Sequence, residues 1–96
     1  MINLQDYIRD IQDFPKPGVL FKDITPLLLH RGASEYCIDN LVALVDDQKI
    51  DKVVAIESRG FFFGMLLAQR LGAGFVPIRK SGKLPYTTVV EPYSLE

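Results

Sequence analysis

The apolar positions of the first eleven residues recur at the spacing of one helix face. Leu4, Tyr7, Ile8 and Ile11 follow the i, i+3, i+4, i+7 pattern that a buried helical stripe produces. We therefore predict a helix over residues 4–11.

Two prolines and a glycine follow in residues 14–18, where a helix cannot continue and the chain can turn sharply. The apolar residues 19–21 form a short extended piece. Thr25 and Pro26 are suited to the cap and the first position of a short helical turn that Gly32 ends.

The next apolar stripe predicts a helix over residues 34–47, with Ser34 as its cap. Its stripe consists of Ile38, Leu41, Val42 and Val45.

The second half of the chain changes to the pattern of a parallel α/β unit. Residues 52–57 are a continuous β-rich run, which is typical of a parallel strand covered on both faces. A helix over 61–71 and a strand over 74–79 follow, and Pro77 places part of the latter at an edge or a bulge. The order predicts a βαβ unit, the opening of an open parallel sheet. Residues 87–90 are either a third strand or an extended arm.

Composition narrows the class of protein. Hydrophobic residues make up 48% and charged residues 24%, the balance of a globular protein rather than a disordered one. Cys37 is the single cysteine, so no internal disulfide can form. We find no secretory signal and no run of about 20 apolar residues, and we expect a cytoplasmic protein without a membrane span.

Charge is distributed unevenly. Residues 58–90 hold five cations and no acid, while the rest holds six cations and twelve acids. A stretch of +5 therefore lies within a chain that is otherwise −6, for a net charge of −1. The cations are Arg59, Arg70, Arg79, Lys80 and Lys83.

Four of these cations fall where an open parallel sheet binds ligands, outside the carboxyl ends of its strands. Arg59 follows the first strand, Arg79 and Lys80 end the second, and Lys83 lies in the loop beyond. The turn at Ser58 also opens a helix, whose free N–H groups suit an anion. We infer a ligand with several phosphate charges. Nucleic acid is disfavoured by the pI of about 5.8 and by the lack of a recognisable binding motif.

Four segments, in order, resemble the motifs of adenine phosphoribosyltransferases. Residues 14–24 (FPKPGVLFKDI) resemble the N-terminal signature, and 57–64 (ESRGFFFG) the first pyrophosphate loop. Residues 75–85 (FVPIRKSGKLP) resemble the second cationic segment, and 93–96 (YSLE) the start of the mobile catalytic loop. The resemblance spans essentially the whole chain and implies the N-terminal half of a type I phosphoribosyltransferase fold.

The resemblance implies purine salvage: adenine and 5-phosphoribosyl 1-pyrophosphate (PRPP) give AMP and pyrophosphate, with Mg²⁺ bound through PRPP. It implies a cytoplasmic homodimer that binds no nucleic acid and no membrane. It divides the chain into a hood-like, base-binding segment, 1–33, and the first part of the core domain, 34–96. It also implies a non-proline cis peptide between Glu57 and Ser58.

Site roles follow from the same resemblance. Main-chain groups of Leu20 would read the adenine edge, Phe21 would lie against its face, and Lys22 stands where many members have arginine. Arg59 would act near the base, and Glu96 matches the loop acid that handles a proton. The pyrophosphate and PRPP contacts would come from Ser58, Arg59, Arg79, Lys80 and Lys83, and the resemblance also allows Lys83 to reach the site from a partner subunit.

One family element is absent from the sequence. The paired acids followed by a Thr-Gly-Gly-Thr-like loop, which grip the ribose 5-phosphate, do not occur, and the one Asp-Asp pair, Asp46 and Asp47, is expected at a solvated helix end. We therefore expect little or no transferase activity from these 96 residues alone. A non-catalytic binding or assembly module, a transferase for another base and a truncated remnant remain as alternatives.

Overall fold

The computed structural model describes residues 2–45 and 47–92. Contacts divide the chain into two compact units, residues 1–48 and 49–96, each of which is described by itself. The division falls after the long helix of the first half, whereas the boundary expected after residue 33 lies inside that helix. No helix among the described residues has the length and the apolar character that crossing a bilayer demands.

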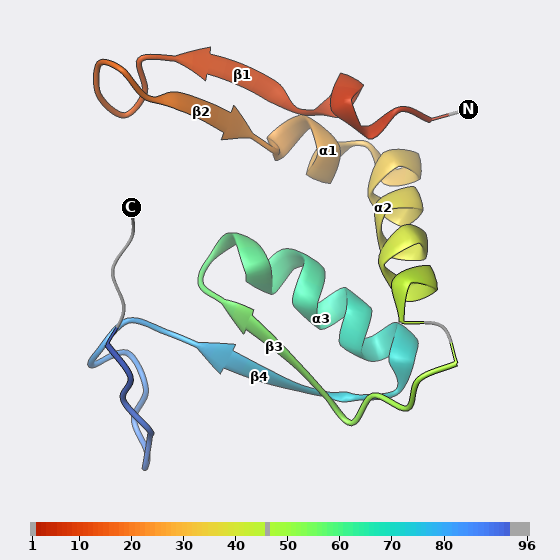
Figure 1. Cartoon of the computed structure of the whole chain (residues 1–96), viewed down its shortest axis with the longest axis vertical. Coiled ribbons are helices and arrows are strands. Elements are labelled where there is room, and N and C mark those ends of the chain that lie inside the picture. The colour runs from red at the N-terminus through yellow and green to blue at the C-terminus, as the bar shows by residue number, and fades with distance from the viewer. Residues whose placement is uncertain (1, 46, 93–96) are drawn as a thin grey trace. The chain divides into compact units, whose positions relative to one another are not determined.

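The first unit begins with a 3-10 helix, η1 (Leu4–Tyr7), and a hairpin of β1 (Arg9–Gln12) and β2 (Leu20–Asp23) (Figure 1). The strands are antiparallel, with Ile11 opposite Phe21. The predicted helix over residues 4–11 is thus wrong beyond its first turn. Residues 9–12 pair with residues 20–23 across the hairpin, and this pairing overrides the local helical spacing.

The hairpin loop is closed by its own polar groups. Asp13 has a positive φ of 59°, and its carboxylate accepts a hydrogen bond from the Gly18 N–H at 2.9 Å. The Phe14 N–H donates to the Val19 carbonyl at 3.1 Å, and the Phe14–Pro15 peptide is cis. Gly18 itself has a φ of 86°, which glycine adopts readily.

Two helices complete the first unit: α1 (Thr25–Leu29) and α2 (Arg31–Leu44). Their caps differ from the expected ones. The Asp23 carboxylate, not Thr25, receives the first free N–H of α1, and it also accepts from the Thr25 hydroxyl. At α2, His30 Nδ1 accepts from the Ala33 N–H at 3.0 Å, so Ser34 lies inside the helix rather than at its cap. The predicted stop at Gly32 is likewise wrong, because Gly32 lies in the first turn of α2. The core of this unit contains Leu27, Ala33 and Ile38.

The second unit is the predicted βαβ unit: β3 (Lys52–Ile56), α3 (Arg59–Leu71) and β4 (Gly74–Ile78) (Figure 1). The strands are parallel, and Ile56 lies opposite Ile78 at their carboxyl ends. Helix α3 ends at Gly72, in the left-handed conformation. In the described part of the chain β4 pairs with β3 alone, and residues 79–92 form neither strand nor helix.

Helix α3 packs closely on one face of this sheet. A Cβ built at Gly64 would lie 2.7 Å from Phe75 Cε1 and 2.8 Å from the Ala55 Cβ, so only glycine fits this contact. The other face is open: Val54 is 55% and Ile56 is 51% exposed. The expectation that the β3 run is covered on both faces is therefore not met in this chain.

Candidate functional site

The carboxyl ends of β3 and β4 bring four of the predicted site residues to one edge of the sheet. Because the strands are parallel and end in register, Ser58 and Arg59 after β3 adjoin Arg79 and Lys80 after β4. Ser58 caps α3 without a side-chain hydrogen bond, and Arg59 is the first helical residue. Lys83 follows in a tight turn, where its N–H donates to the Lys80 carbonyl at 3.1 Å.

Glu57 lies among these cations. Its N–H donates to the Ile78 carbonyl at 2.9 Å, one step beyond the last ladder pair. Its carboxylate accepts a hydrogen bond from the Lys80 N–H and forms an ion pair with Arg79 Nε at 3.5 Å. The side chain is only 16% exposed. The expected cis peptide between Glu57 and Ser58 is present.

The electrostatics of this edge follow from those contacts. The hydrogen bond from the Lys80 N–H, above all, holds the pKa of the Glu57 carboxyl below its ordinary value. Burial opposes this shift, and the charges of Arg79 and Lys80 add to it. Glu57 is therefore ionised at neutral pH and offsets one of the positive charges. The Arg79 guanidinium also lies 6.0 Å from the ring centroid of Phe61, in the first turn of α3.

The predicted base-binding residues, Leu20, Phe21 and Lys22, are consecutive in β2. Leu20 is 47% exposed, and Phe21 packs edge-on against Phe14 with ring centroids 5.0 Å apart. Lys22 Nζ lies 2.6 Å from the Asp10 carboxylate. This edge of the hairpin therefore offers an exposed apolar residue, an aromatic pair and a paired cation.

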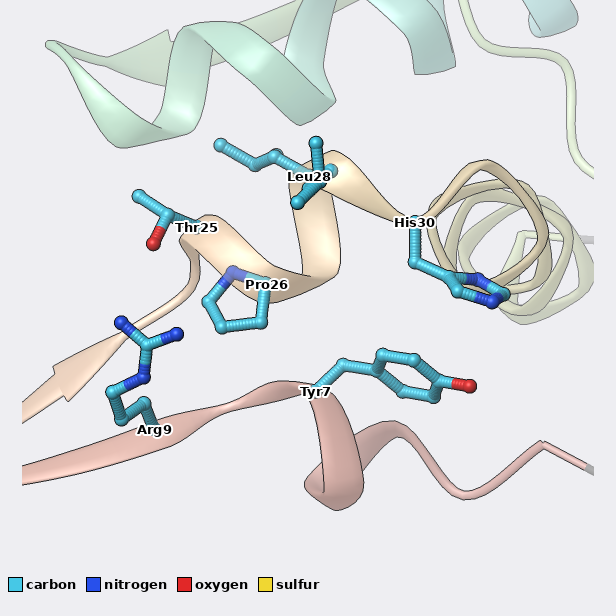
Figure 2. Close-up of a pocket in the computed structure, with 7 residues that line it drawn as sticks. Tyr7, Arg9, Thr25, Pro26, Leu28 and His30 are labelled. Atoms are coloured by element: carbon cyan, nitrogen blue, oxygen red, sulfur yellow. The ribbon is translucent and has the colours of Figure 1, made fainter.

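A pocket of about 670 Å³ lies in the same unit, but none of the three predicted base-binding residues lines it. Figure 2 shows the ring of Tyr7 on one side and the turn of α1 on the other. Its lining residues are Tyr7, Arg9, Thr25, Pro26, Leu28, Leu29 and His30.

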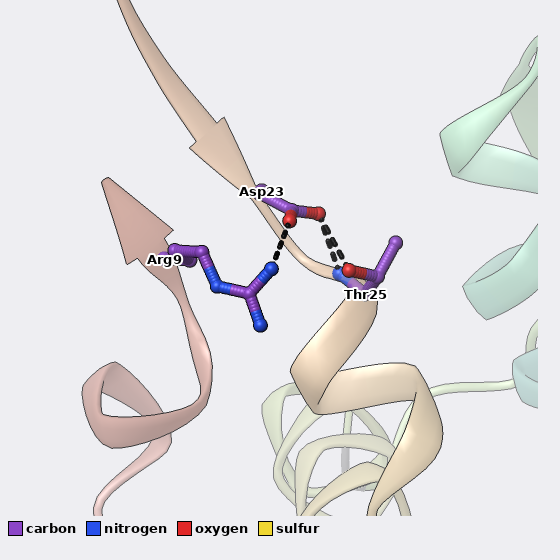
Figure 3. Close-up of polar contacts among 3 residues, drawn as sticks. All are labelled: Arg9, Asp23 and Thr25. Carbon is purple, nitrogen blue, oxygen red and sulfur yellow. Dashed lines mark hydrogen bonds and ion pairs between the residues drawn. The ribbon is translucent and has the colours of Figure 1, made fainter. Parts of the chain in front are cut away.

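The polar rim of that pocket is fixed by Asp23. Arg9 donates to its carboxylate at 3.2 Å, and Thr25 donates through its N–H and its hydroxyl (Figure 3). The pKa of Asp23 is lowered, first by the Thr25 N–H and its hydroxyl. Asp23 thereby ties the strand end of the hairpin to the start of α1.

Two predicted features lie outside the described residues: Glu96, with its neighbours 93–95, and Asp46. Among the residues that the structure does describe, no cluster of three or more His, Cys, Asp or Glu side chains could hold a metal ion. Glu57 is the site residue that the sequence did not identify, because it lies one position before the acid-free cationic stretch 58–90. Aligning the two strand ends would have placed Glu57 beside Arg79.

No protein-family model matches the chain. An adenine phosphoribosyltransferase of Flavobacterium johnsoniae is 59% identical over 95 residues, which is 99% of this chain and 56% of that protein. The chain thus spans about half the length of the curated relatives it matches. The resemblance to adenine phosphoribosyltransferases is confirmed over the whole chain.

Solved structures show the same fold. The crystal structure of adenine phosphoribosyltransferase from Thermoanaerobacter pseudethanolicus matches with a TM-score of 0.90 and 50% identity, covering 94% of this chain and 54% of that one. The Saccharomyces cerevisiae enzyme, crystallised with an iminoaltritol bisphosphate and adenine, matches with a TM-score of 0.80 and 42% identity, over 88% of this chain and 52% of that one. The α/β fold of this chain is that of the N-terminal half of these enzymes.

Proposed function

We propose that this chain is the N-terminal half of an adenine phosphoribosyltransferase and carries its adenine-binding hairpin and its pyrophosphate-binding edge. The reaction would join N9 of adenine to C1 of the ribose of PRPP, break the bond from C1 to pyrophosphate, and release a proton from the base. The 59% identity to a curated enzyme of that name supports this proposal, and the observation that carries it is the cationic edge at the ends of β3 and β4.

The cationic edge suits the charge that this reaction develops. As the bond to C1 breaks, the ribose becomes cationic and negative charge accumulates on the departing pyrophosphate. Fixed cations stabilise that charge without reorganising, which is the largest contribution in many enzymes. Arg79 can grip phosphate with two parallel hydrogen bonds, while Lys80 and Lys83 act as point charges. Ser58 and Arg59 contribute from the opening turn of α3.

The hairpin offers chemistry suited to a purine. Main-chain groups at Leu20 can donate to and accept from the edge of adenine, and the ring of Phe21 can lie against its face. Lys22 would hold its ammonium near the base, where its present partner is Asp10. Arg59 would act near the base as a catalytic residue, and Glu96 would take or return the purine proton.

Mg²⁺ fits this site as a companion of the substrate rather than as an ion held by the protein. The described acid at the edge, Glu57, is engaged by Lys80 and Arg79, and no described cluster offers three ligands. Bound to pyrophosphate oxygens, the ion would neutralise part of the leaving-group charge. We also propose a homodimer in the cytoplasm, with Lys83 of one subunit reaching the site of the other.

Calorimetric titration of the 96-residue chain with inorganic pyrophosphate and Mg²⁺ tests the edge directly. Arg79→Ala should weaken binding by about tenfold or more, because a charge-assisted hydrogen bond contributes about 1.5–3 kcal/mol. Lys83→Ala should weaken it less, as a point charge in an exposed turn.

The matched control is Lys49→Ala, which removes one exposed cation from the same unit ahead of β3. Equal loss of affinity in the control and in Arg79→Ala would mean that pyrophosphate senses only net charge. That result would contradict a site at the strand ends.

A further inference from the structure

Glu57 extends the pairing of β3 and β4 beyond the last ladder pair, first with its main-chain N–H and then with its side chain. The ladder of β3 and β4 ends at Ile56 and Ile78, and the Glu57 N–H adds one more bond to the Ile78 carbonyl. At Ser58 the chain turns into α3, and the Lys80 N–H has no main-chain partner in the ladder of β3 and β4, which ends at Ile78. The Glu57 carboxylate accepts that hydrogen bond instead.

The same carboxylate also holds the side chain of Arg79, the residue between Ile78 and Lys80. Arg79 Nε lies 3.5 Å from the oxygen that accepts from Lys80, and the Arg79 guanidinium is directed over the start of α3 beside Phe61. A single, largely buried acid thus contacts the backbone of one predicted pyrophosphate ligand and the side chain of another.

We propose that Glu57 is the positioning residue of the pyrophosphate-binding edge: its carboxylate sets the path of the chain after β4 and the direction of Arg79. Glu57 does not touch the ligand in this assignment. The identity of the ligand, pyrophosphate, rests on the proposed function. The positioning role itself rests only on the contacts of Glu57 with Lys80 and Arg79.

A positioning role and a simple counter-ion role predict opposite changes in pyrophosphate affinity when Glu57 is removed. A negative charge among cations should oppose the binding of an anion, so its removal should strengthen pyrophosphate binding if charge alone matters. If Glu57 positions Arg79 and Lys80, its removal should weaken binding even though the edge becomes more positive.

The experiment compares Glu57→Ala, which removes the acceptor and the charge, with Glu57→Gln, which keeps an acceptor oxygen for the Lys80 N–H. The matched control is Asp51→Asn, which makes the same change in charge at the other end of β3. Each variant of the 96-residue chain is titrated with inorganic pyrophosphate and Mg²⁺ by calorimetry, and circular dichroism checks that each one is folded.

We expect Glu57→Ala to bind pyrophosphate about tenfold more weakly than Asp51→Asn, the effect of one lost charge-assisted hydrogen bond. Glu57→Gln should restore most of that affinity. Binding by Glu57→Ala that equals or exceeds that of Asp51→Asn would overturn the inference. So would equal losses in the alanine and glutamine variants.

A second readout separates this inference from the proposed function. In a proton NMR titration, the Lys80 amide should shift as the Glu57 carboxyl protonates in acid, and the shift should vanish in Glu57→Gln. Arg79 and Lys80 are the charged residues that act on this carboxyl. If the wild-type chain binds no pyrophosphate, the proposed function fails, and this titration alone decides whether Glu57 holds Lys80. A Lys80 amide that does not respond to Glu57 overturns the positioning role.

Discussion

Gly64 is the position where a single methyl group should disturb the whole second unit. It lies in the middle of α3, and a Cβ there would meet Phe75 Cε1 at 2.7 Å and the Ala55 Cβ at 2.8 Å. Favourable carbon contacts lie at about 3.5–4.0 Å, so these atoms must separate by roughly 1 Å. Neither neighbour can yield easily, since Ala55 is fixed to β3 and the Phe75 ring packs edge-on against Phe61.

The magnitude follows from two opposing contributions. Overpacking a close contact costs about 1–3 kcal/mol, whereas alanine is favoured over glycine by about 1 kcal/mol inside a helix. The difference is about 0–2 kcal/mol, and the two contacts below 3 Å favour the upper part of that range. We expect Gly64→Ala to lower the free energy of unfolding by about 1–2 kcal/mol, measured by urea denaturation followed by circular dichroism.

The double variant identifies the cause. In a Phe75→Leu background the ring atom at 2.7 Å is gone, so Gly64→Ala should cost less there than in the wild-type chain. The reasoning is refuted if Gly64→Ala leaves stability unchanged or raises it. It is also refuted if the penalty is undiminished when the ring is removed.

Gly72→Ala should lower the free energy of unfolding by roughly 1–2 kcal/mol, because its φ of 67° disfavours a side chain although nothing lies within 4 Å of the added Cβ. Gly72→Asn should cost less, and equal urea midpoints for all three chains would contradict this. The free energy of unfolding should fall in acid, because the pKa values of Asp23 and Glu57 in the folded chain lie below their ordinary 3.8 and 4.5. The stability that these two carboxylates contribute is complete above about pH 5 and is lost as the pH falls through the lowered values. A urea midpoint that does not change between neutral pH and about pH 3 would be incompatible with that linkage. Burial raises the pKa of the Cys37 thiol, so iodoacetamide should modify it more slowly than it modifies glutathione, until urea exposes it; equal rates without urea would refute the effect.

The second unit could be predicted because its signals are local. The β-rich run before Ser58, the helix closed by Gly72 and the strand containing Pro77 each appear as a continuous stretch, and the structure confirms all three elements. The cationic edge follows from them, because parallel strands place their carboxyl ends together.

The first unit resisted prediction because its hairpin depends on pairing across the loop between residues 12 and 20, which the spacing of apolar residues within 4–11 does not reveal. Ile11 fits a helical stripe by its spacing, yet it lies opposite Phe21 in a strand. The caps also differ. Asp23 and His30 supply the acceptors expected of Thr25 and Ser34, since side chains from just before each helix reach its free N–H groups. Base-binding roles for Leu20 and Phe21 came from family resemblance and stay predictions.

The most direct test of the central claim is AMP synthesis by a completed chain. The 96 residues are fused to the C-terminal part of the Flavobacterium johnsoniae enzyme that they do not cover, and AMP is measured after adding PRPP, Mg²⁺ and competing bases. The account predicts AMP from adenine, a preference for adenine over hypoxanthine and guanine, and a large loss of turnover in Arg59→Ala. A folded fusion that makes no AMP, or that prefers another base, would contradict it.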